Sequence, residues 1–405
     1  MSGERIDTLH AVTSPLSLVL LRGQLRYLRA AGFHPAALSG PGPFVEQVGL
    51  GLSVPVFTVA MEREVSPLHD LASLVRIWRL LRQLRPSICN AGTPKAGLLV
   101  MLAAWLARVP CRVYTMRGLR VETARGLTRM ILFAAERIAC GCAHRVICVS
   151  PSLRDRAVKL KLANAHKIVV LGSGSSNGVD VARFVPTPAR AARAAEIRHV
   201  LKLGSRPVIG FIGRFTRDKG IAELTTAFDL VRQQFAGASL LLIGSYEQGD
   251  AIELEVRARI DAGLGIEVVP FQPDIAPYYL AMDIFVLPTY REGFPNTVLE
   301  AQAAERPVVT TKATGAIDSV LDGTSGILVP VGDSRALADA IGKLLANPSI
   351  ARRMGHAGRE RVEHEFRQEI VWGELIDLYR ALLQERGLPV PAAATPEERL
   401  CLQKQ

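Results

Sequence analysis

Gly213-Arg-Phe-Thr-Arg-Asp-Lys-Gly220 is the stretch that decides the fold, and it lies between an apolar run and a helical pattern. The apolar run, Val208–Ile212, is typical of a buried strand, and a helix is predicted from Ile221 onward. Glycine lets the backbone approach a ligand closely, and a helix N-terminus offers N–H groups to an anion. Arg214 and Lys219 add positive charge, so the segment suits a diphosphate. A tight turn that carries exposed basic residues would have the same sequence pattern.

A second polar segment, Glu292-Gly-Phe-Pro-Asn-Thr-Val-Leu-Glu300, follows the strand predicted at Ile284–Leu287. A helix is expected to open at Pro295–Thr297, with Glu300 in its first turn and Glu292 in the loop before it. Glu292 is placed to meet a cationic centre or sugar hydroxyls, and Glu300 to hold a ribose. The alternative is that both glutamates only complement the helix dipole.

Outward from these segments, short apolar runs alternate with helical patterns along the whole chain. This order predicts an α/β protein with parallel sheets covered on both faces. Turn formers between Gly172 and Pro207 interrupt the pattern. We therefore predict two Rossmann-like, doubly wound domains that face a central cleft, at residues 1–185 and 186–385, with a tail at 386–405. The last helix could pack back on the N-terminal domain.

Charge is divided unevenly between the two halves of this 405-residue chain, whose net charge is +11. Residues 1–170 contain 23 Lys and Arg against 9 Asp and Glu, and the remainder contains 26 against 29. A basic half suits a phosphate-rich partner such as an anionic membrane surface or a phosphorylated acceptor. Nucleic acid is disfavoured, because the basic half lacks interleaved aromatic residues and any recognised binding motif.

The sequence shows no motif typical of a metal site or a cofactor site, and no segment typical of a transmembrane helix. The six cysteines and eight histidines show no metal-binding spacing, so we expect no metal ion, no cofactor and free thiols in a reducing cytoplasm. The longest apolar stretch, Ala96–Val109, is too short to span a bilayer, and no signal peptide is visible. The expected location is cytoplasmic, with any membrane contact peripheral. An oxidoreductase is disfavoured, because no G-x-G-x-x-G follows the first strand.

The paired segments resemble a known family. Gly213-Arg214 with Lys219-Gly220, followed about 70 residues later by Glu292 and Glu300, is similar to the signature of retaining glycosyltransferases of the GT-B fold, family four, also called group 1. Matching pieces run from Ser14-Pro15 to Gly332 and cover most of the chain. Asn90–Gly97, Arg117–Glu122 and Gly172–Asp180 resemble transferases of bacterial capsule, O-antigen and exopolysaccharide synthesis.

The resemblance implies roles for named residues. Arg214 and Lys219 would bind the donor diphosphate and stabilise its charge as it leaves, and Glu292 would contact the transferred sugar. Glu300 would bind the ribose. The remaining donor-binding positions would be Gly213, Phe294, Asn296, Thr297, Phe271 and Gln272, with Phe271 and Gln272 in the base pocket. A UDP-sugar is the expected donor, and positive charge with helix-end N–H groups would replace a metal.

The N-terminal half departs from the family pattern. Ser14-Pro-Leu-Ser17 stands where relatives have a Gly-Gly pair, and Ser14 and Ser17 are the candidate phosphate contacts there. Arg117 stands where relatives carry a His-Gly pair, and it is expected either to contact a phosphate or hydroxyl or to pair with a carboxylate such as Glu122. Lys95 is a candidate on the acceptor side.

The resemblance implies transfer to a polyprenyl-diphosphate-linked glycan. A sugar-nucleotide epimerase or a non-catalytic sugar-nucleotide-binding protein of the same fold are the alternatives. The arginines Arg76, Arg79, Arg82 and Arg85 suggest a membrane-facing helix, with Leu74, Ile77 and Trp78 dipping into the interface.

Overall fold

The computed structural model describes residues 6–42, 45, 51, 54–62 and 66–392. The chain divides into two compact units, one of Met1–Asn177 with Gln368–Gln405 and the other of Gly178–Arg367. These are called unit 1 and unit 2. The division falls after Asn177 rather than after residue 185, and residues 368–385 belong to unit 1. The sequence prediction of two parallel-sheet α/β units is confirmed.

Unit 1 is built on a seven-stranded sheet of order β3-β2-β1-β4-β5-β6-β7, in which every neighbouring pair is parallel. Because both faces are covered, the central strands are buried along their length, although each contains one or two polar residues. The strands are β1 Thr8–Ala11, β2 Pro35–Ser39, β3 Val56–Thr58, β4 Ile88–Ala91, β5 Cys111–Met116, β6 Arg145–Cys148 and β7 Ile168–Val169.

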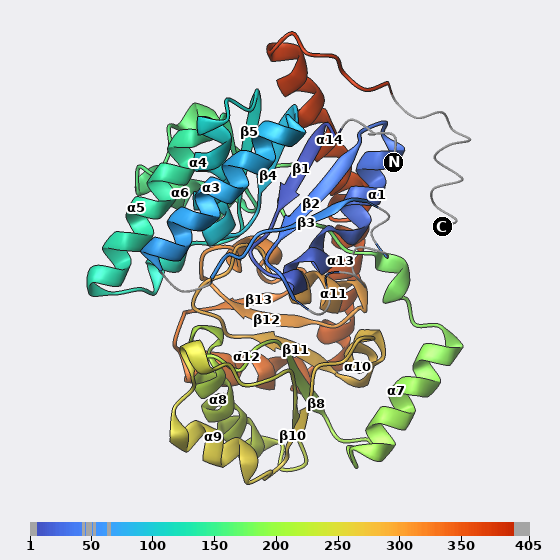
Figure 1. Cartoon of the computed structure of the whole chain (residues 1–405). Helices are drawn as coiled ribbons and strands as arrows, with labels where there is room; N and C mark the ends of the chain where they lie inside the picture. Colours follow the sequence, from blue (N-terminus) through green and yellow to red (C-terminus); the bar gives the residue numbers. More distant parts are fainter. Residues whose placement is uncertain (1–5, 43–44, 46–50, 52–53, 63–65, 393–405) are drawn as a thin grey trace. The chain divides into compact units, whose positions relative to one another are not determined.

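Helices α3, α4 and α5 lie side by side against the unit 1 sheet, and α1 packs with α14 (Figure 1). Each of α3, α4 and α6 begins with proline, whose missing N–H costs nothing in a first helical turn. The helices are α1 Arg22–Ala30, α3 Pro67–Leu84, α4 Pro94–Leu106, α5 Gly126–Cys142, α6 Pro151–Lys159 and α14 Gln368–Glu385.

Helix α14 joins unit 1 because its apolar face completes that unit's core. Leu375, Tyr379 and Leu383 are buried with residues of α1 and of the sheet. The Tyr379 hydroxyl accepts a hydrogen bond of 2.7 Å from the Asn90 amide on β4. The last helix of the described chain therefore packs on the sheet formed by the N-terminal strands. The order of elements in the sequence does not reveal this packing.

Unit 2 is a second all-parallel sheet, of order β10-β9-β8-β11-β12-β13. Its strands are β8 Val208–Ile212, β9 Ser239–Ile243, β10 Ile266–Val269, β11 Ile284–Leu287, β12 Val308–Thr311 and β13 Ile327–Val329. Its helices are α7 Pro188–Val200, α8 Ile221–Gln234, α9 Leu254–Asp261, α10 Ala276–Ala281, α11 Asn296–Ala303, α12 Ser334–Ala346 and α13 Pro348–Glu365. All six strands end at one edge, and the polar segments singled out above follow β8 and β11 there.

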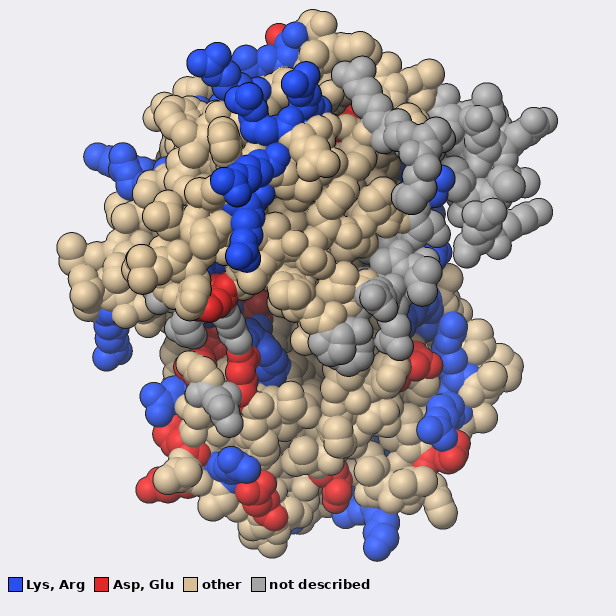
Figure 2. Space-filling model, in the orientation of Figure 1, with Lys and Arg blue, Asp and Glu red and all other residues tan. Residues whose placement is uncertain are grey.

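The charge difference between the halves reappears on the surface. Among the charged side chains on the face shown in Figure 2, those on unit 1 are mostly Lys and Arg, whereas both signs are mixed on unit 2. Within the described ranges, no helix is both long and apolar enough to cross a bilayer.

The contribution of α14 to unit 1 can be tested at Tyr379. Tyr379→Ala removes a fully buried ring and should lower the free energy of unfolding by about 3–5 kcal/mol. Tyr379→Phe leaves the Asn90 amide without its acceptor and should cost about 1–3 kcal/mol. Asp377→Ala, on the exposed side of the same helix, is the control and should change little. Denaturant unfolding measures all three; equal stability of Tyr379→Ala and the control would contradict the role given to α14.

Candidate functional site

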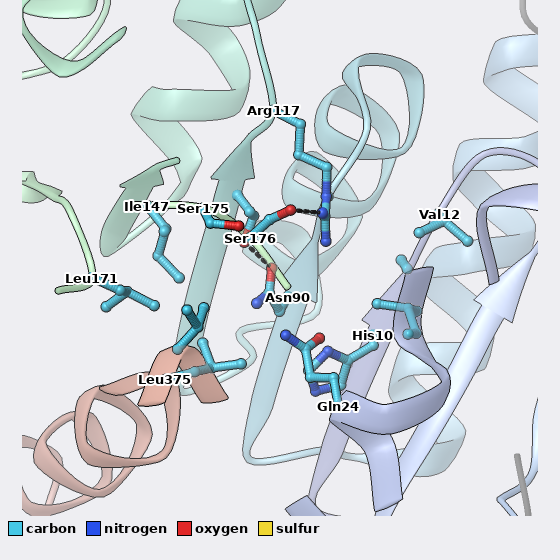
Figure 3. Close-up of a pocket in the computed structure, with 15 residues that line it drawn as sticks. His10, Val12, Gln24, Asn90, Arg117, Ile147, Leu171, Ser175, Ser176 and Leu375 are labelled. Carbon is cyan, nitrogen blue, oxygen red and sulfur yellow. Dashed lines mark hydrogen bonds between the residues drawn. The ribbon is translucent and has the colours of Figure 1, made fainter. Parts of the chain in front are cut away.

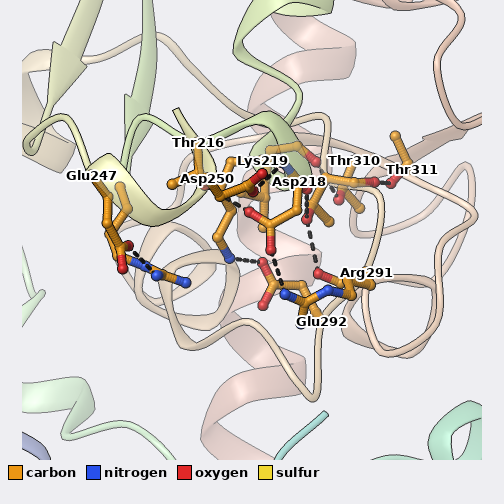
Figure 4. Close-up of polar contacts among 12 residues, drawn as sticks. Thr216, Asp218, Lys219, Glu247, Asp250, Arg291, Glu292, Thr310 and Thr311 are labelled. Atoms are coloured by element: carbon orange, nitrogen blue, oxygen red, sulfur yellow. Dashed lines mark hydrogen bonds and ion pairs between the residues drawn. The ribbon is translucent and has the colours of Figure 1, made fainter. Parts of the chain in front are cut away.

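The candidate site in unit 2 lies at the carboxyl edge of its sheet, where the loops after β8, β9 and β11 meet (Figure 4). Ligands of open parallel sheets bind at this edge, because the backbone leaves the sheet there and helices begin there. The structure brings Arg214, Lys219 and Glu292 together here, and Glu300 lies on the helix that follows β11.

Gly220 fixes how the loop after β8 meets the loop after β11. Its φ of 70° lies in the left-handed region, and it caps the N-terminus of α8. A Cβ on Gly220 would lie 2.0 Å from the carbonyl oxygen of Pro288, which directly follows β11. Both the conformation and the close approach require glycine. Lys219 is thereby held beside the loop that carries Glu292.

Lys219 and Glu292 form an ion pair, and Arg214 pairs with Glu247 from the loop after β9. The Lys219 and Glu292 side chains are each 15% exposed, whereas Arg214 is 49% exposed. The two pairs therefore set two cations and two carboxylates along the rim of one sheet edge. A diphosphate could take up the charge of the cations, and sugar hydroxyls could bond to the carboxylates.

Asp218 is the residue that sequence reasoning missed, although it stands inside the first motif. Its carboxylate accepts 2.6 Å and 2.7 Å bonds from the Thr216 hydroxyl and the Arg291 guanidinium. Its carbonyl oxygen accepts from the backbone N–H of Tyr290 at 2.8 Å. Burial acts to raise the pKa of Asp218, but the Thr216 and Arg291 contacts outweigh burial and hold this pKa below its usual range. Asp218 thus stays ionised and fastens the two loops to each other.

Glu300 is the fifth residue of α11, at the start of its second turn rather than in the first turn as predicted. Its carboxylate accepts a 2.8 Å hydrogen bond from the Tyr279 hydroxyl on α10. Burial raises the pKa of Glu300 to about 7, against the opposing effect of the Tyr279 bond. Glu300 therefore changes protonation state near neutral pH, a property that the motif does not disclose.

The other predicted donor-binding residues take different positions. Asn296 and Thr297 form the first turn of α11. The Phe294 ring packs against Phe366, with ring centroids 5.2 Å apart, so its side chain supports the loop rather than facing a ligand. Phe271 is 78% exposed just beyond β10, and the Gln272 amide bonds to the carbonyl oxygen of Pro270. An exposed aromatic ring at the strand ends is available for a base to stack on.

Arg117, Ser14 and Ser17 belong to unit 1. Ser14 follows β1, and its hydroxyl lies 3.4 Å from that of Ser17. Arg117 follows β5 and lines a pocket (Figure 3). The carboxylate suggested for Arg117, Glu122, forms its ion pair with Arg156 instead. Lys95 pairs with Asp70 at 2.6 Å, so this predicted acceptor contact is already neutralised.

The described part of the chain contains no group of three or more His, Cys, Asp or Glu side chains that could hold a metal ion. Arg214, Lys219, Glu247 and Glu292 come from three loops, those that follow β8, β9 and β11.

Each unit contains residues that match a known protein-family domain. Residues 4–174 match the glycosyl transferase 4-like domain, and residues 206–347 match the glycosyl transferases group 1. The capsular polysaccharide biosynthesis glycosyltransferase CapM of Staphylococcus aureus is 38% identical over 93% of this chain and 97% of its own length. A UDP-Gal:alpha-D-GlcNAc-diphosphoundecaprenol alpha-1,3-galactosyltransferase of Escherichia coli is 26% identical over 70% of this chain and 73% of its own length.

A solved structure shows the same fold. HepE of Anabaena in complex with UDP has a TM-score of 0.77, with 19% sequence identity, and the match covers 93% of this chain and all of HepE. Together with the two matched domains and the extended identity to CapM, these likenesses confirm the resemblance drawn from the paired motifs. The chain belongs to the group 1 glycosyltransferases and is a glycosyltransferase of bacterial polysaccharide biosynthesis.

Proposed function

We propose that the chain transfers a hexose from a UDP-linked donor, with retention of anomeric configuration, to a polyprenyl-diphosphate-linked glycan. The observation that carries the proposal is the Lys219–Glu292 pair beside Arg214 at the carboxyl edge of the unit 2 sheet. The name of the Escherichia coli relative supports both substrates, since it states a UDP-galactose donor and a diphosphoundecaprenol-linked acceptor. The epimerase and non-catalytic alternatives lose support, because the matched family and relatives are glycosyltransferases.

Arg214 and Lys219 serve the leaving group in this proposal. The bond between the sugar C1 and the distal phosphate oxygen breaks, and the acceptor oxygen bonds to C1 on the same face. The acceptor proton passes to an oxygen of the departing UDP. Negative charge grows on the diphosphate as that bond breaks, and two fixed cations stabilise it without reorganisation. The proposal therefore assigns charge stabilisation to side chains and includes no divalent metal.

Glu292 and Glu300 serve the donor's hydroxyls. Glu292 exchanges its bond to Lys219 for sugar hydroxyls when the diphosphate takes up the lysine's charge. Glu300, one helical turn inside α11, accepts bonds from the ribose. Phe271 and Gln272 lie where a base can be held beyond β10.

A kinetic test separates the leaving-group cations from ordinary surface charge. Arg214→Ala and Lys219→Ala should each lower kcat about 10²–10³-fold, because their charge acts mainly in the transition state. Arg217→Ala is the control, since Arg217 lies in the same loop but is exposed and pairs with Glu253. Transfer from UDP-glucose is measured in excess chelator, where the unsubstituted chain should stay active. A near-normal kcat/KM in both variants would overturn these roles.

The second test uses the titration of Glu300. Only the carboxylate can accept bonds from two ribose hydroxyls, so affinity for UDP-glucose should rise by up to about tenfold between pH 6 and pH 8. The sign follows from the raised pKa, because the acid form persists to about pH 7 and is lost as pH rises. Glu300→Gln should bind weakly and without this pH dependence, and the exposed Glu255→Gln should behave as the parent chain. Calorimetric titration of each protein gives the result; a pH dependence retained in Glu300→Gln would count against the assignment.

We also propose that unit 1 binds an anionic membrane surface, with a change in the apolar residues involved. Ile77 is fully buried, and Leu74 and Trp78 are half-buried, with Arg82 over the Trp78 ring. The prediction that Ile77 lies at the interface is therefore wrong, and the half-buried Leu74 and Trp78 are replaced in this proposal by more exposed residues. Leu68 and Leu71 on α3 are 83% and 59% exposed instead.

Helix α5 adds a second apolar stripe. Leu127, Met130 and Ile131, spaced at helical intervals, are 71%, 69% and 40% exposed, and the exposed Arg125 and Arg129 flank them. Helices α3 and α5 each follow a strand of the parallel sheet, so the N-terminal ends of both lie at the carboxyl edge of that sheet. Helix α4 packs between them. Apolar side chains among arginines suit a headgroup layer, where each arginine contributes about 1 kcal/mol.

Vesicle sedimentation tests this surface. The parent chain should bind vesicles with 30% or so anionic lipid at low salt and release them at high salt, since exposed charges are screened beyond roughly 8–10 Å. The double variant Leu127→Ser with Met130→Ser should lose most of the binding. Leu254→Ser, at an exposed leucine of unit 2, should retain it. Absence of binding at low salt, or equal binding by the double variant, would remove the membrane proposal and leave the transferase proposal standing.

A further inference from the structure

Unit 1 contains a small pocket, lined by both polar and apolar side chains, at the carboxyl ends of β1, β4 and β5 (Figure 3). From β1 the sheet continues through β2 to β3, and from β4 it continues in the opposite direction through β5 to β7. The pocket thus lies where the strand order reverses, the usual ligand position of an open parallel sheet. Its polar lining includes His10, Gln24, Asn90, Thr115, Arg117 and Ser176.

Arg117 brings a positive charge into this pocket without a carboxylate to balance it. Its Nη1 donates to the Ser176 hydroxyl at 2.5 Å, and its Nε is buried with no acceptor among the described residues. No ion pair joins it to an acidic side chain in that part of the chain. Burial lowers the pKa of Arg117 to about 10, which still leaves the guanidinium charged at neutral pH. Arg117 is only partly buried, but charges shielded from water are normally paired in proteins, so a guanidinium without a carboxylate partner is suited to an anion.

His10 is a second incompletely bonded group in the same pocket. It is 2% exposed, and its Nε2 is buried without a partner among the described residues. Burial, and then the charge of Arg117, lower the pKa of His10 to about 3, so the imidazole is neutral. The neighbouring Asn90 side chain donates to the Tyr379 hydroxyl and accepts from the Thr115 hydroxyl. A neutral ring that can donate a hydrogen bond therefore accompanies the cation.

Gly92 makes room for the guanidinium. It follows β4, and a Cβ at this position would lie 2.9 Å from Arg117 Nε and 3.4 Å from Nη2. Any larger residue would push the arginine away from the strand ends. Glycine at residue 92 therefore leaves space for the Arg117 side chain at the ends of the strands.

We infer that this pocket binds a phosphate group of a phosphate ester, with Arg117 as the main ligand and Ser176 and His10 as neutral donors. The planar guanidinium matches the spacing of phosphate oxygens, and the pocket's polar residues include no carboxylate that would repel an anion. This inference rests on the proposed function, which supplies two possible sources of the phosphate group. One is the diphosphate of a lipid-linked acceptor, and the other is the diphosphate of the nucleotide-sugar donor.

Calorimetric titration of the full chain tests the inference with three probes, geranyl diphosphate, UDP-glucose and inorganic phosphate. Arg117→Gln should weaken binding of at least one probe tenfold or more. Gly92→Ala should weaken the same probe, because it displaces the guanidinium while keeping its charge. The control is Arg120→Gln, an exposed arginine three residues farther along, whose affinities should match the parent's within twofold. The Tm of Arg117→Gln should equal or exceed that of the parent, since the variant removes a partly buried charge that has no carboxylate partner.

The probes distinguish the sources. Loss confined to geranyl diphosphate assigns the site to the acceptor, loss confined to UDP-glucose assigns it to the donor, and loss confined to inorganic phosphate assigns it to free anion. Each supports a phosphate site. If Arg117→Gln and Gly92→Ala bind all three probes as Arg120→Gln does, or if Arg117→Gln lowers the Tm without changing any affinity, the inference is overturned. Binding is measured without turnover, so failure of the transferase proposal would not produce this result.

Discussion

The candidate donor site depends on the close approach of the Gly220 backbone to the carbonyl oxygen of Pro288. This approach brings the loop after β8 onto the loop after β11, two strands that are adjacent in the sheet but about 70 residues apart in the chain. Asp218 strengthens the junction through Arg291 and through the backbone of Tyr290. A side chain at residue 220 would separate the loops and so remove Lys219 from Glu292. The charge pattern of the site therefore depends on one backbone approach that only glycine permits.

The two units treat positive charge differently. At the unit 2 edge, Lys219, Arg214 and Arg291 each pair with a carboxylate, so the site is held in place by interactions that a ligand could exchange. In unit 1, Lys95 is paired but Arg117 is bonded only to a hydroxyl. An ion pair adds little to stability by itself, but a cation that is shielded from water and has no partner carries a desolvation cost. The cost at Arg117 is intelligible when an anionic ligand supplies the missing charge, as at other sites where function conflicts with local stability.

Stability and function also meet at α14. The helix is distant in sequence from the strands it covers, yet Tyr379 lies over β4 and bonds to Asn90, which in turn accepts from Thr115. Both of these residues line the pocket that contains Arg117. Through Tyr379, helix α14 thus orients two side chains, Asn90 and Thr115, that line a pocket at the ends of the N-terminal strands. Exposed apolar residues on α3 and α5 remain outside this core and stay free for another surface.

By itself, the sequence determined the α/β class and the two parallel sheets, and it predicted donor-binding roles for Arg214, Lys219, Glu292 and Glu300. These follow from local periodicity and from motif spacing, because strands, helix starts and loop residues are encoded within a few positions of one another. The family resemblance followed from the same spacing and needed no long-range information.

Only the tertiary structure decided what surrounds each side chain. Residues far apart in the chain determine whether Lys95 meets Asp70, whether Ile77 is buried, and whether Glu300 contacts Tyr279 and titrates near neutral pH. The return of α14 to unit 1 and the isolation of Arg117 from Glu122 have the same origin. Burial and pairing depend on packing between distant segments, and a linear pattern of residue types does not record that packing.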